Sequence, residues 1–223
     1  MTNTDAEIHS LFPTPICSYK GFDQQEELKL YLVDLLQRSQ ARKNSQDQRL
    51  LHYFDTNNSG ILTLKDPLLE ALKLWVLSCG KDFITRVQGY QCEDLQVISS
   101  WLNWANQGGA QSVHAHENSF ISGTYYMCFE KGHAPIRFWR PASHSQANTP
   151  YMSLLKTETE TIFSSNEVWV APAEGTLLLW PSHLLHGHSG NARDGRFCLS
   201  LNLMPTKLIG SSYSLSIAPL ASS

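Results

Sequence analysis

The sequence lacks the features of several specialised protein classes. It has only five cysteines among 223 residues, and none of them forms a Cys-x-x-Cys pair. Their odd number and scattered positions argue against a disulfide framework and against a thiolate zinc site. We therefore expect reduced thiols, as in a cytoplasmic protein.

Long hydrophobic runs and a strong charge of either sign are also missing. No apolar stretch approaches the ~20 residues that cross a bilayer, and the segment from Met1 to Ser10 has no basic-then-apolar signal pattern. The formal net charge is −3 and the pI is near 6.3, so nothing in the overall charge attracts nucleic acid or an anionic membrane. We expect a soluble, cytoplasmic protein without a nucleic-acid or membrane partner, and the sequence leaves its oligomeric state open.

The composition is that of a folded globular domain. Hydrophobic residues make up 42% of the chain and charged residues 17%. A chain of this length often forms one β-rich unit, so we expect a single domain over residues 1–223. Within it we expect a strand and supporting helices in residues 1–94, a β-rich core in 95–206 and a C-terminal strand or tail in 207–223.

The first third predicts one strand and two helices. Leu11–Ile16 contains two prolines that bias their predecessors away from helix, which predicts an edge strand. A capping-box-like start at Asp23 precedes leucines at helical spacing. A second helix is predicted from Asp66, a helix N-cap followed by proline, to Gly89. Both helices should pack outside a sheet.

From Leu95 onward the hydrophobic period changes to that of short strands separated by Gly, Pro, Asn or Ser. This pattern predicts a mainly β fold with flanking helices (α+β), built on a barrel or sandwich. The loop-like region from Lys131 to Phe163 is where we expect a substrate lid. The predicted strands are Leu95–Trp104, Gln111–His116, Phe120–Phe129, Pro135–Trp139, Glu167–Ala171, Thr176–Trp180, Leu184–His188 and Phe197–Met204.

The histidine pattern indicates a metal site. His114 and His116 would lie on the same side of an extended strand, because side chains alternate with a period of two. Such a pair can hold one metal ion, with a third ligand from the later stretch that contains His183, His186 and His188. The alternative is a pair of hydrogen-bonded structural histidines. We interpret the remaining histidines as structural or solvent-facing; they are His9, His52, His133 and His144.

Arg196 is the other residue that suggests a ligand. It shares one strand face with Cys198, Ser200 and Asn202, so it should point into the core. A buried guanidinium needs an anion, and a carboxylate suits it because the two groups pair in a bidentate way. That carboxylate could belong to a ligand, or to a protein acid such as Glu174 or Asp194.

The chain resembles a family of Fe(II)/2-oxoglutarate oxygenases with a His-x-His…His…Arg arrangement. The resemblance covers nearly the whole chain, and the order and spacing of its motifs are more specific than any one of them. It implies a double-stranded β-helix (jelly-roll or cupin-like) core. The motifs are Leu11–Ile16, Trp101-Leu102-Asn103, His114-x-His116, Asn118–Tyr126, Gly175–Ser182 with His186, and Arg196 with Ser200-Leu201-Asn202.

The resemblance also implies a set of site residues. His114, His116 and His186 correspond to the iron ligands, although the wider superfamily has Asp or Glu where this chain has His116. Glu117 could supply a carboxylate instead, but strand alternation points it away. His183 and His188 are the rival third ligands.

For the cosubstrate, the resemblance assigns the far carboxylate of 2-oxoglutarate to Arg196, with a hydrogen bond from Tyr126. Cys198 falls where many relatives place a second contact, and Asn103 reaches the cosubstrate from the preceding strand. The implied cofactors are Fe(II), 2-oxoglutarate and O2.

The implied activity is hydroxylation of an unactivated C–H bond of an amino-acid, peptide or small-molecule substrate, with release of succinate and CO2. One alternative is a cupin-type three-histidine dioxygenase that does not use 2-oxoglutarate. Gly108 and the His114-x-His116 pair match the start of a cupin motif, but Phe120 and Ile121 stand where its glutamate is expected. A further alternative is a non-catalytic binding module on the same barrel.

Overall fold

The structure is a computed structural model that describes residues 7–10, 12–38, 42–43, 47–53, 60–140, 158–159, 161 and 164–218. Most of the expected lid region lies outside these residues, as do Leu11 and His144. Within them, no helix is long and apolar enough to span a membrane.

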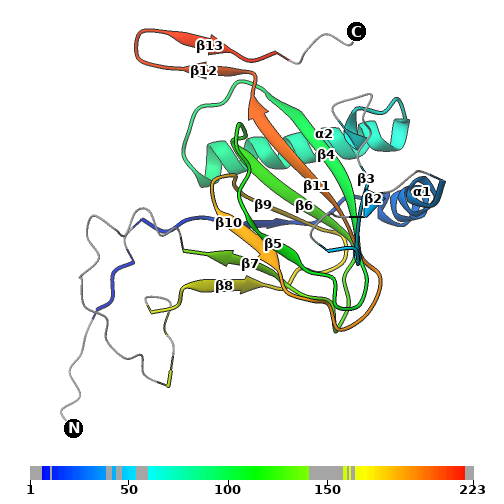
Figure 1. Cartoon of the computed structure of the whole chain (residues 1–223). Coiled ribbons are helices and arrows are strands. Elements are labelled where there is room, and N and C mark those ends of the chain that lie inside the picture. The colour runs from blue at the N-terminus through cyan, green and yellow to red at the C-terminus, as the bar shows by residue number, and fades with distance from the viewer. Residues whose placement is uncertain are drawn as a thin grey trace.

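Two antiparallel sheets face each other and form the body of the molecule (Figure 1). The larger sheet has the strand order β1-β9-β6-β11-β4-β3-β2, and the smaller has the order β5-β10-β7-β8. A separate ribbon of β12 and β13 extends from one end (Figure 1). The bounds are β1 Cys17–Tyr19, β2 Arg42–Lys43, β3 Leu50–Tyr53, β4 Leu95–Ala105, β5 Gln111–His114, β6 Ile121–Cys128, β7 Ile136–Trp139, β8 Glu167–Val170, β9 Thr176–Pro181, β10 Leu185–His188, β11 Arg196–Pro205, β12 Lys207–Ile209 and β13 Ser214–Ser216.

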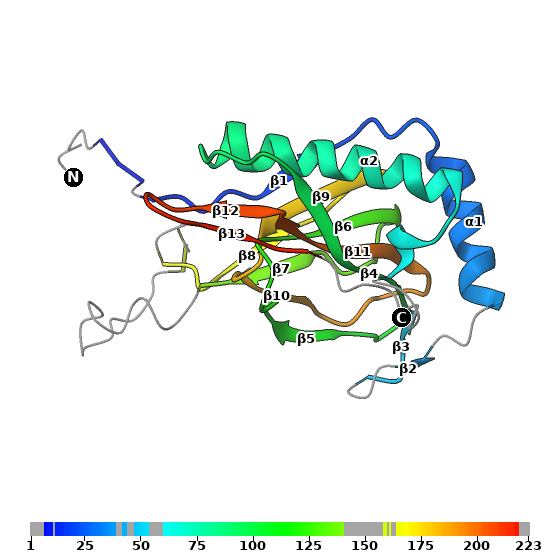
Figure 2. The same ribbon diagram turned by 90° about the horizontal axis from the view of Figure 1, so that it is seen from above.

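Two helices cover the outer face of the larger sheet, as Figure 2 shows. They are α1 (Gln25–Arg38) and α2 (Pro67–Asp82), and α2 continues into a π-helical turn at Phe83–Val87. The predicted N-cap is confirmed, because the Asp66 side chain accepts hydrogen bonds from the backbone N–H groups of the second and third residues after it. A 3-10 turn at Ile61–Thr63 precedes α2.

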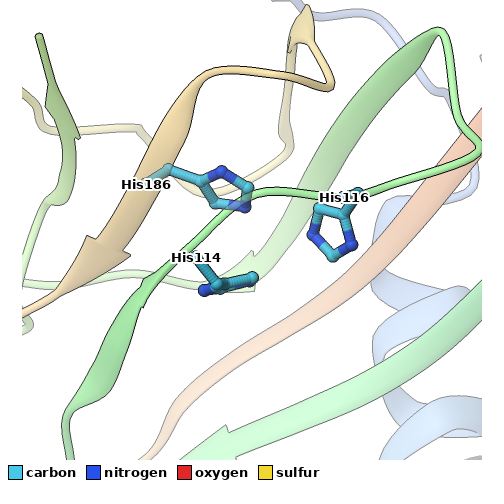
Figure 3. A group of neighbouring side chains, drawn as sticks. All are labelled: His114, His116 and His186. Atoms are coloured by element: carbon cyan, nitrogen blue, oxygen red, sulfur yellow. The ribbon is translucent and has the colours of Figure 1, made fainter. Parts of the chain in front are cut away.

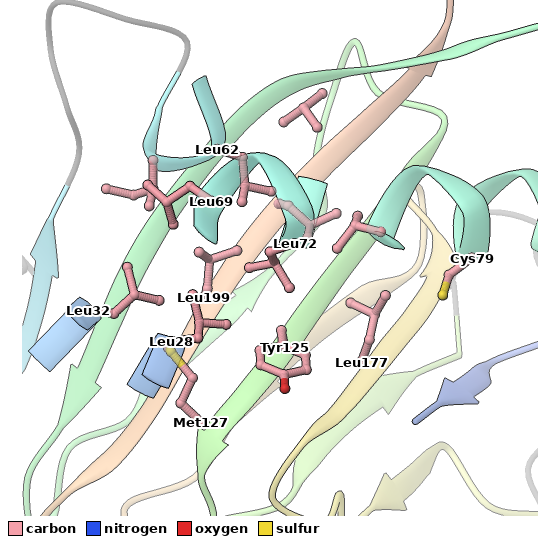
Figure 4. Packing of buried hydrophobic residues seen from close by; sticks show 14 of the residues in the cluster. Leu28, Leu32, Leu62, Leu69, Leu72, Cys79, Tyr125, Met127, Leu177 and Leu199 are labelled. Atoms are coloured by element: carbon pink, nitrogen blue, oxygen red, sulfur yellow. The ribbon is translucent and has the colours of Figure 1, made fainter. Parts of the chain in front are cut away.

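Strand alternation gives the larger sheet two different faces. On the face toward the helices, leucine and aromatic side chains from β6, β9 and β11 pack against α1 and α2 (Figure 4). On the opposite face β11 presents the polar set that starts at Arg196, and this face looks toward the smaller sheet. A second, smaller apolar cluster, which includes Phe138 and Trp180, fills part of the space between the sheets. The molecule therefore has three layers: helices, larger sheet and smaller sheet.

Three local predictions need correction. Residues 12–16 are not a strand; the first strand is Cys17–Tyr19, which pairs with β9 just after the two prolines that cannot donate to a ladder. The short strands β2 and β3 were not predicted from the sequence. The predicted strand Gln111–His116 ends at His114, so His116 lies beyond it.

Candidate metal centre

Three histidine side chains converge in a cavity between the two sheets (Figure 3). His114 on β5 and His186 on β10 are direct cross-strand partners, and their ring centroids lie 4.4 Å apart. The ring of His116 lies 5.0 Å from that of His114 and 5.1 Å from that of His186. One ring nitrogen from each residue lies within 4.8 Å of the other two, which is close enough for all three to hold one metal ion.

Backbone carbonyls fix the orientation of two of these rings. His114 Nδ1 lies 2.8 Å from the carbonyl oxygen of Ser112, and His186 Nδ1 lies 2.8 Å from that of Leu184. A carbonyl only accepts hydrogen bonds, so each Nδ1 carries the proton and donates it. The Nε2 lone pairs of both rings are left available, as is usual for metal-binding histidines.

A turn, not a strand, positions His116. Its backbone N–H donates to the carbonyl oxygen of Ser182 over 3.1 Å, and its ring packs at 5.5 Å from that of Trp101. In the same turn Asn118 adopts a left-handed φ of 54°, which asparagine tolerates better than most residues. The prediction that these histidines share one strand face is therefore wrong, although their rings do come together.

Burial keeps the buried histidines neutral. Desolvation, together with a smaller effect of nearby His114, lowers the pKa of His186 to about 3 and that of His116 to about 4. Neutral imidazole is the form that binds a metal. The rings therefore need no deprotonation at neutral pH.

The rival ligands lie elsewhere. His183 and Glu117 are exposed to solvent. His188 is buried and lines the cavity, but its Nδ1 lies 2.9 Å from the carbonyl oxygen of Ser189 and it is not part of the histidine cluster. Among the described residues, the three histidines His114, His116 and His186 are the one group of potential ligand side chains close enough to share an ion.

Arg196 extends into the same cavity without a protein carboxylate. Its side chain is 4% exposed, and its contacts are the carbonyl oxygen of Ala134 at 3.2 Å, Cys198 Sγ at 3.6 Å and the Tyr126 hydroxyl at 3.4 Å. No acidic residue in the described part of the chain forms an ion pair with it. Glu174 instead pairs with a lysine of α1, and Asp194 accepts a hydrogen bond from a backbone N–H. An internal salt bridge from Arg196 to Glu174 or Asp194 is thus excluded.

The other predicted cosubstrate residues line the cavity too. Tyr126 and Cys198 are buried beside Arg196, and burial raises the pKa of both groups, so the phenol and the thiol are neutral. Asn103 on β4 donates to Ser200 Oγ over 2.8 Å. All four residues therefore lie on the cavity wall formed by the larger sheet.

His52 was not predicted to belong to the site. It lies on β3, pairs with Asn103 across the ladder and lines the cavity, and burial lowers its pKa. The strand that carries it is short and follows a polar run, so hydrophobic periodicity gives no signal there. Arg137 on β7 forms an ion pair with Glu167 and stacks against two tryptophans.

The residues in the cavity fit both an iron ion and a carboxylate cosubstrate. Imidazole is a suitable ligand for iron, and two of the rings are already oriented to present Nε2. A buried guanidinium without a carboxylate provides the counter-charge that a dicarboxylate ligand needs. The three histidines and Arg196 thus line one cavity.

Comparison with known proteins agrees with this chemistry. Residues 99–202 match the model of the family described as "Putative 2OG-Fe(II) oxygenase". That region contains the three histidines, Arg196 and most of both sheets. A search of curated proteins finds no match to the sequence.

Solved structures share the fold at low sequence identity. HygX from Streptomyces hygroscopicus, solved with nickel, 2-oxoglutarate and hygromycin B bound, is 14% identical, with a TM-score of 0.56 over 86% of this chain and 84% of its own. The non-heme alpha ketoglutarate dependent epimerase SnoN from nogalamycin biosynthesis is 10% identical, with a TM-score of 0.62 over 87% of this chain and 77% of its own. A prolyl-4-hydroxylase from Pseudomonas putida is 9% identical, with a TM-score of 0.57 over 85% of this chain and 92% of its own.

At these identities the structural likeness shows a common fold, the double-stranded β-helix. The family match implies, in addition to the fold, the use of Fe(II), 2-oxoglutarate and O2. Residues 99–202 are therefore similar to the family described as 2OG-Fe(II) oxygenases, on a fold that the solved structures share.

Proposed function

We propose that the protein oxidises an unactivated C–H bond of a small-molecule, amino-acid or peptide substrate, with hydroxylation as the reaction and succinate and CO2 as the coproducts. In this proposal His114, His116 and His186 hold the iron. The observation that supports it most directly is that three converging imidazoles and a buried arginine without a carboxylate partner among the described residues share one cavity.

Bound Fe(II) would supply the activation of O2, and the residues around it have separate tasks. Arg196 binds the far carboxylate of 2-oxoglutarate through charge-assisted hydrogen bonds, and Tyr126 adds its hydroxyl next to the guanidinium. Cys198 and Asn103 contact the cosubstrate from the same sheet. These four residues fix the cosubstrate at the inner wall of the cavity.

A three-histidine set carries no negative charge, unlike the two-histidine, one-carboxylate triad of the wider superfamily. Such a ligand set would not neutralise any of the positive charge of the ion. An anionic cosubstrate would offset that charge. We expect metal affinity and 2-oxoglutarate affinity to be strongly coupled in this protein, because each charge stabilises the other in a cavity of low dielectric constant.

The substrate class rests on the structural neighbours. HygX was solved with hygromycin B and SnoN with nogalamycin RO, which favours a small molecule. The likeness to a prolyl-4-hydroxylase is the reason for including peptides among the proposed substrates. The neighbours also include an epimerase and a carbocyclase, so product analysis is the measurement that distinguishes hydroxylation from these reactions.

Metal analysis tests the ligand assignment. The iron content of protein purified without chelators is measured for wild type, His114→Ala and His186→Ala, with the exposed His183→Ala as the matched control. We expect both site variants to lose iron and His183→Ala to retain it. Equal iron in all four proteins, each folded by circular dichroism, would contradict the ligand assignment.

Anaerobic absorption spectroscopy tests the cosubstrate. Fe(II) and 2-oxoglutarate should produce a visible charge-transfer band that Arg196→Ala weakens. A spectrum of the iron-loaded protein that does not respond to 2-oxoglutarate favours the cupin-type alternative. Succinate formation with candidate substrates, followed by mass spectrometry of the product, then separates hydroxylation from other oxidations.

A further inference from the structure

His116 differs from the other two histidines in how it is held. His114 and His186 belong to paired strands and each donates Nδ1–H to a carbonyl. His116 follows the end of β5, and Figure 3 shows it on the connecting segment beyond that strand. No backbone carbonyl contacts its ring nitrogens among the described hydrogen bonds. Another group must therefore orient this ring if it is to act with the other two.

The Asn202 side chain is placed to do this. Asn202 lies on the cavity face of β11 and is 6% exposed. Its Nδ2 atom lies 3.5 Å from His116 Nδ1 and donates to Ser99 Oγ over 2.9 Å. Its Oδ1 atom accepts a hydrogen bond from Ser122 Oγ over 2.8 Å. The amide is thus held at both ends and has one edge toward the ring.

A chain of serine hydroxyls links this amide back to the turn that carries the histidine. Ser122 Oγ also lies 2.9 Å from Ser182 Oγ, and Ser182 Oγ lies 2.8 Å from Ser119 Oγ. Ser119 is three residues after His116, and the carbonyl of Ser182 accepts the His116 backbone N–H. The network therefore fixes both the turn and the ring that projects from it.

We propose that Asn202 is a positioning residue that sets the orientation and tautomer of the His116 ring. This inference rests on the proposed iron site. A ring that binds a metal through Nε2 must carry its proton on Nδ1 and needs an acceptor there. In the structure Asn202 Nδ2 faces this nitrogen, and rotation of the amide would present Oδ1 as that acceptor. Ser99 and Ser122 tolerate both amide orientations, because a hydroxyl can donate or accept.

Packing alone does not account for Asn202. The neighbouring residues on the opposite face of β11 are buried leucines that pack against the helices, so the strand has its apolar contacts without this side chain. A buried amide is costly unless its hydrogen-bonding groups are satisfied. Here they are satisfied by a network that ends on a candidate ligand.

Metal affinity is the first test. Titration calorimetry with Ni(II), which avoids turnover, compares wild type with Asn202→Ala, Asn202→Asp and the control Ser200→Ala. We expect Asn202→Ala to bind nickel about 10- to 100-fold more weakly, the usual effect of removing a group that orients a ligand. Asn202→Asp keeps an acceptor and should restore the affinity. Ser200→Ala removes a hydroxyl from the same strand face without a contact to His116 and should leave it unchanged.

The second test measures the tautomer of the His116 ring. Nitrogen-15 NMR of the metal-free protein gives the tautomer of each histidine, and the His116 signals are assigned by their loss in His116→Ala. We expect Asn202→Ala to change the tautomer balance of His116 alone, because carbonyls hold the other two rings. Unchanged tautomers and unchanged nickel affinity would overturn the proposal. If wild type binds no nickel, the iron site is overturned, and the NMR result still decides whether Asn202 orients His116.

Discussion

Replacing Arg196 by methionine should separate cosubstrate binding from folding stability, because the two effects have opposite signs. The guanidinium is buried and has no carboxylate partner among the described residues. Methionine keeps much of the side-chain length and removes the charge. The variant should bind 2-oxoglutarate more weakly. The ligand-free variant should no longer be destabilised by an uncompensated buried charge.

The size of the binding loss follows from two charge-assisted hydrogen bonds. Each contributes about 1.5–3 kcal/mol, so their removal costs roughly 3–6 kcal/mol. Since about 1.4 kcal/mol is a factor of ten, the dissociation constant for 2-oxoglutarate should rise about a hundred- to ten-thousand-fold. In the ligand-free protein, the guanidinium of Arg196 meets neutral groups, namely one carbonyl, one thiol and one phenol at 3.2–3.6 Å. Because these neutral partners do not compensate a buried charge, we expect the thermal midpoint of the ligand-free variant to stay the same or rise.

Titration calorimetry of the nickel-loaded protein measures the affinity, and thermal unfolding with and without 2-oxoglutarate measures both stabilities. Arg137→Met is the matched control. Its guanidinium already has a carboxylate in Glu167 and stacks against Trp139 and Trp169, so this variant should bind 2-oxoglutarate normally. An Arg196→Met protein that binds the cosubstrate within a few-fold of wild type, or that is much less stable without ligand, would refute the reasoning.

Two further predictions concern stability. The Asp47 carboxylate accepts hydrogen bonds from the Arg49 side chain and from two backbone N–H groups, which hold its pKa well below the ordinary value of 3.8. The unfolded chain therefore binds this proton more tightly than the folded protein does. The carboxylate thus stabilises the fold above about pH 4, and this stabilisation is lost as the pH falls. Acid titrations of unfolding for wild type and Asp47→Asn should converge at low pH, and parallel curves would contradict this account. Gly123→Ala would place a Cβ 2.5 Å from Leu179 Cδ2 and 2.9 Å from a backbone carbonyl, so urea unfolding should show a decrease in stability of about 1–3 kcal/mol, and an unchanged midpoint would show that the strands can move apart.

The β-rich core could be predicted well because its signal is local. The alternation from Phe197 to Leu203 and the N-cap at Asp66 each depend on neighbouring residues, and the structure has them where the sequence places them. The first strand was misplaced for the opposite reason. Whether residues 12–16 or Cys17–Tyr19 form the strand depends on which of them reaches the edge of β9, a non-local contact.

The candidate site was also predicted where the signal is local and missed where it depends on non-local contacts. The spacing of His114 and His116 indicates a metal site, but His116 lies beyond the end of β5, so strand alternation does not account for its position. His52 could not be found because its place in the cavity depends on the pairing of β3 with β4. The role that we infer for Asn202 depends on hydroxyls from three separate strands or turns, which no spacing along one strand reveals.

The position of β5 at the margin of the smaller sheet has a consequence for how the protein retains its shape. β5 pairs with β10 on one side only, and such terminal strands are among the first parts of a domain to open. In the proposed site, a single ion would bind this strand, the turn after it and β10, which are about seventy residues apart in sequence. The ion would then act as a removable cross-link, so that iron supply controls the local unfolding of one margin of the barrel as well as the capacity for catalysis.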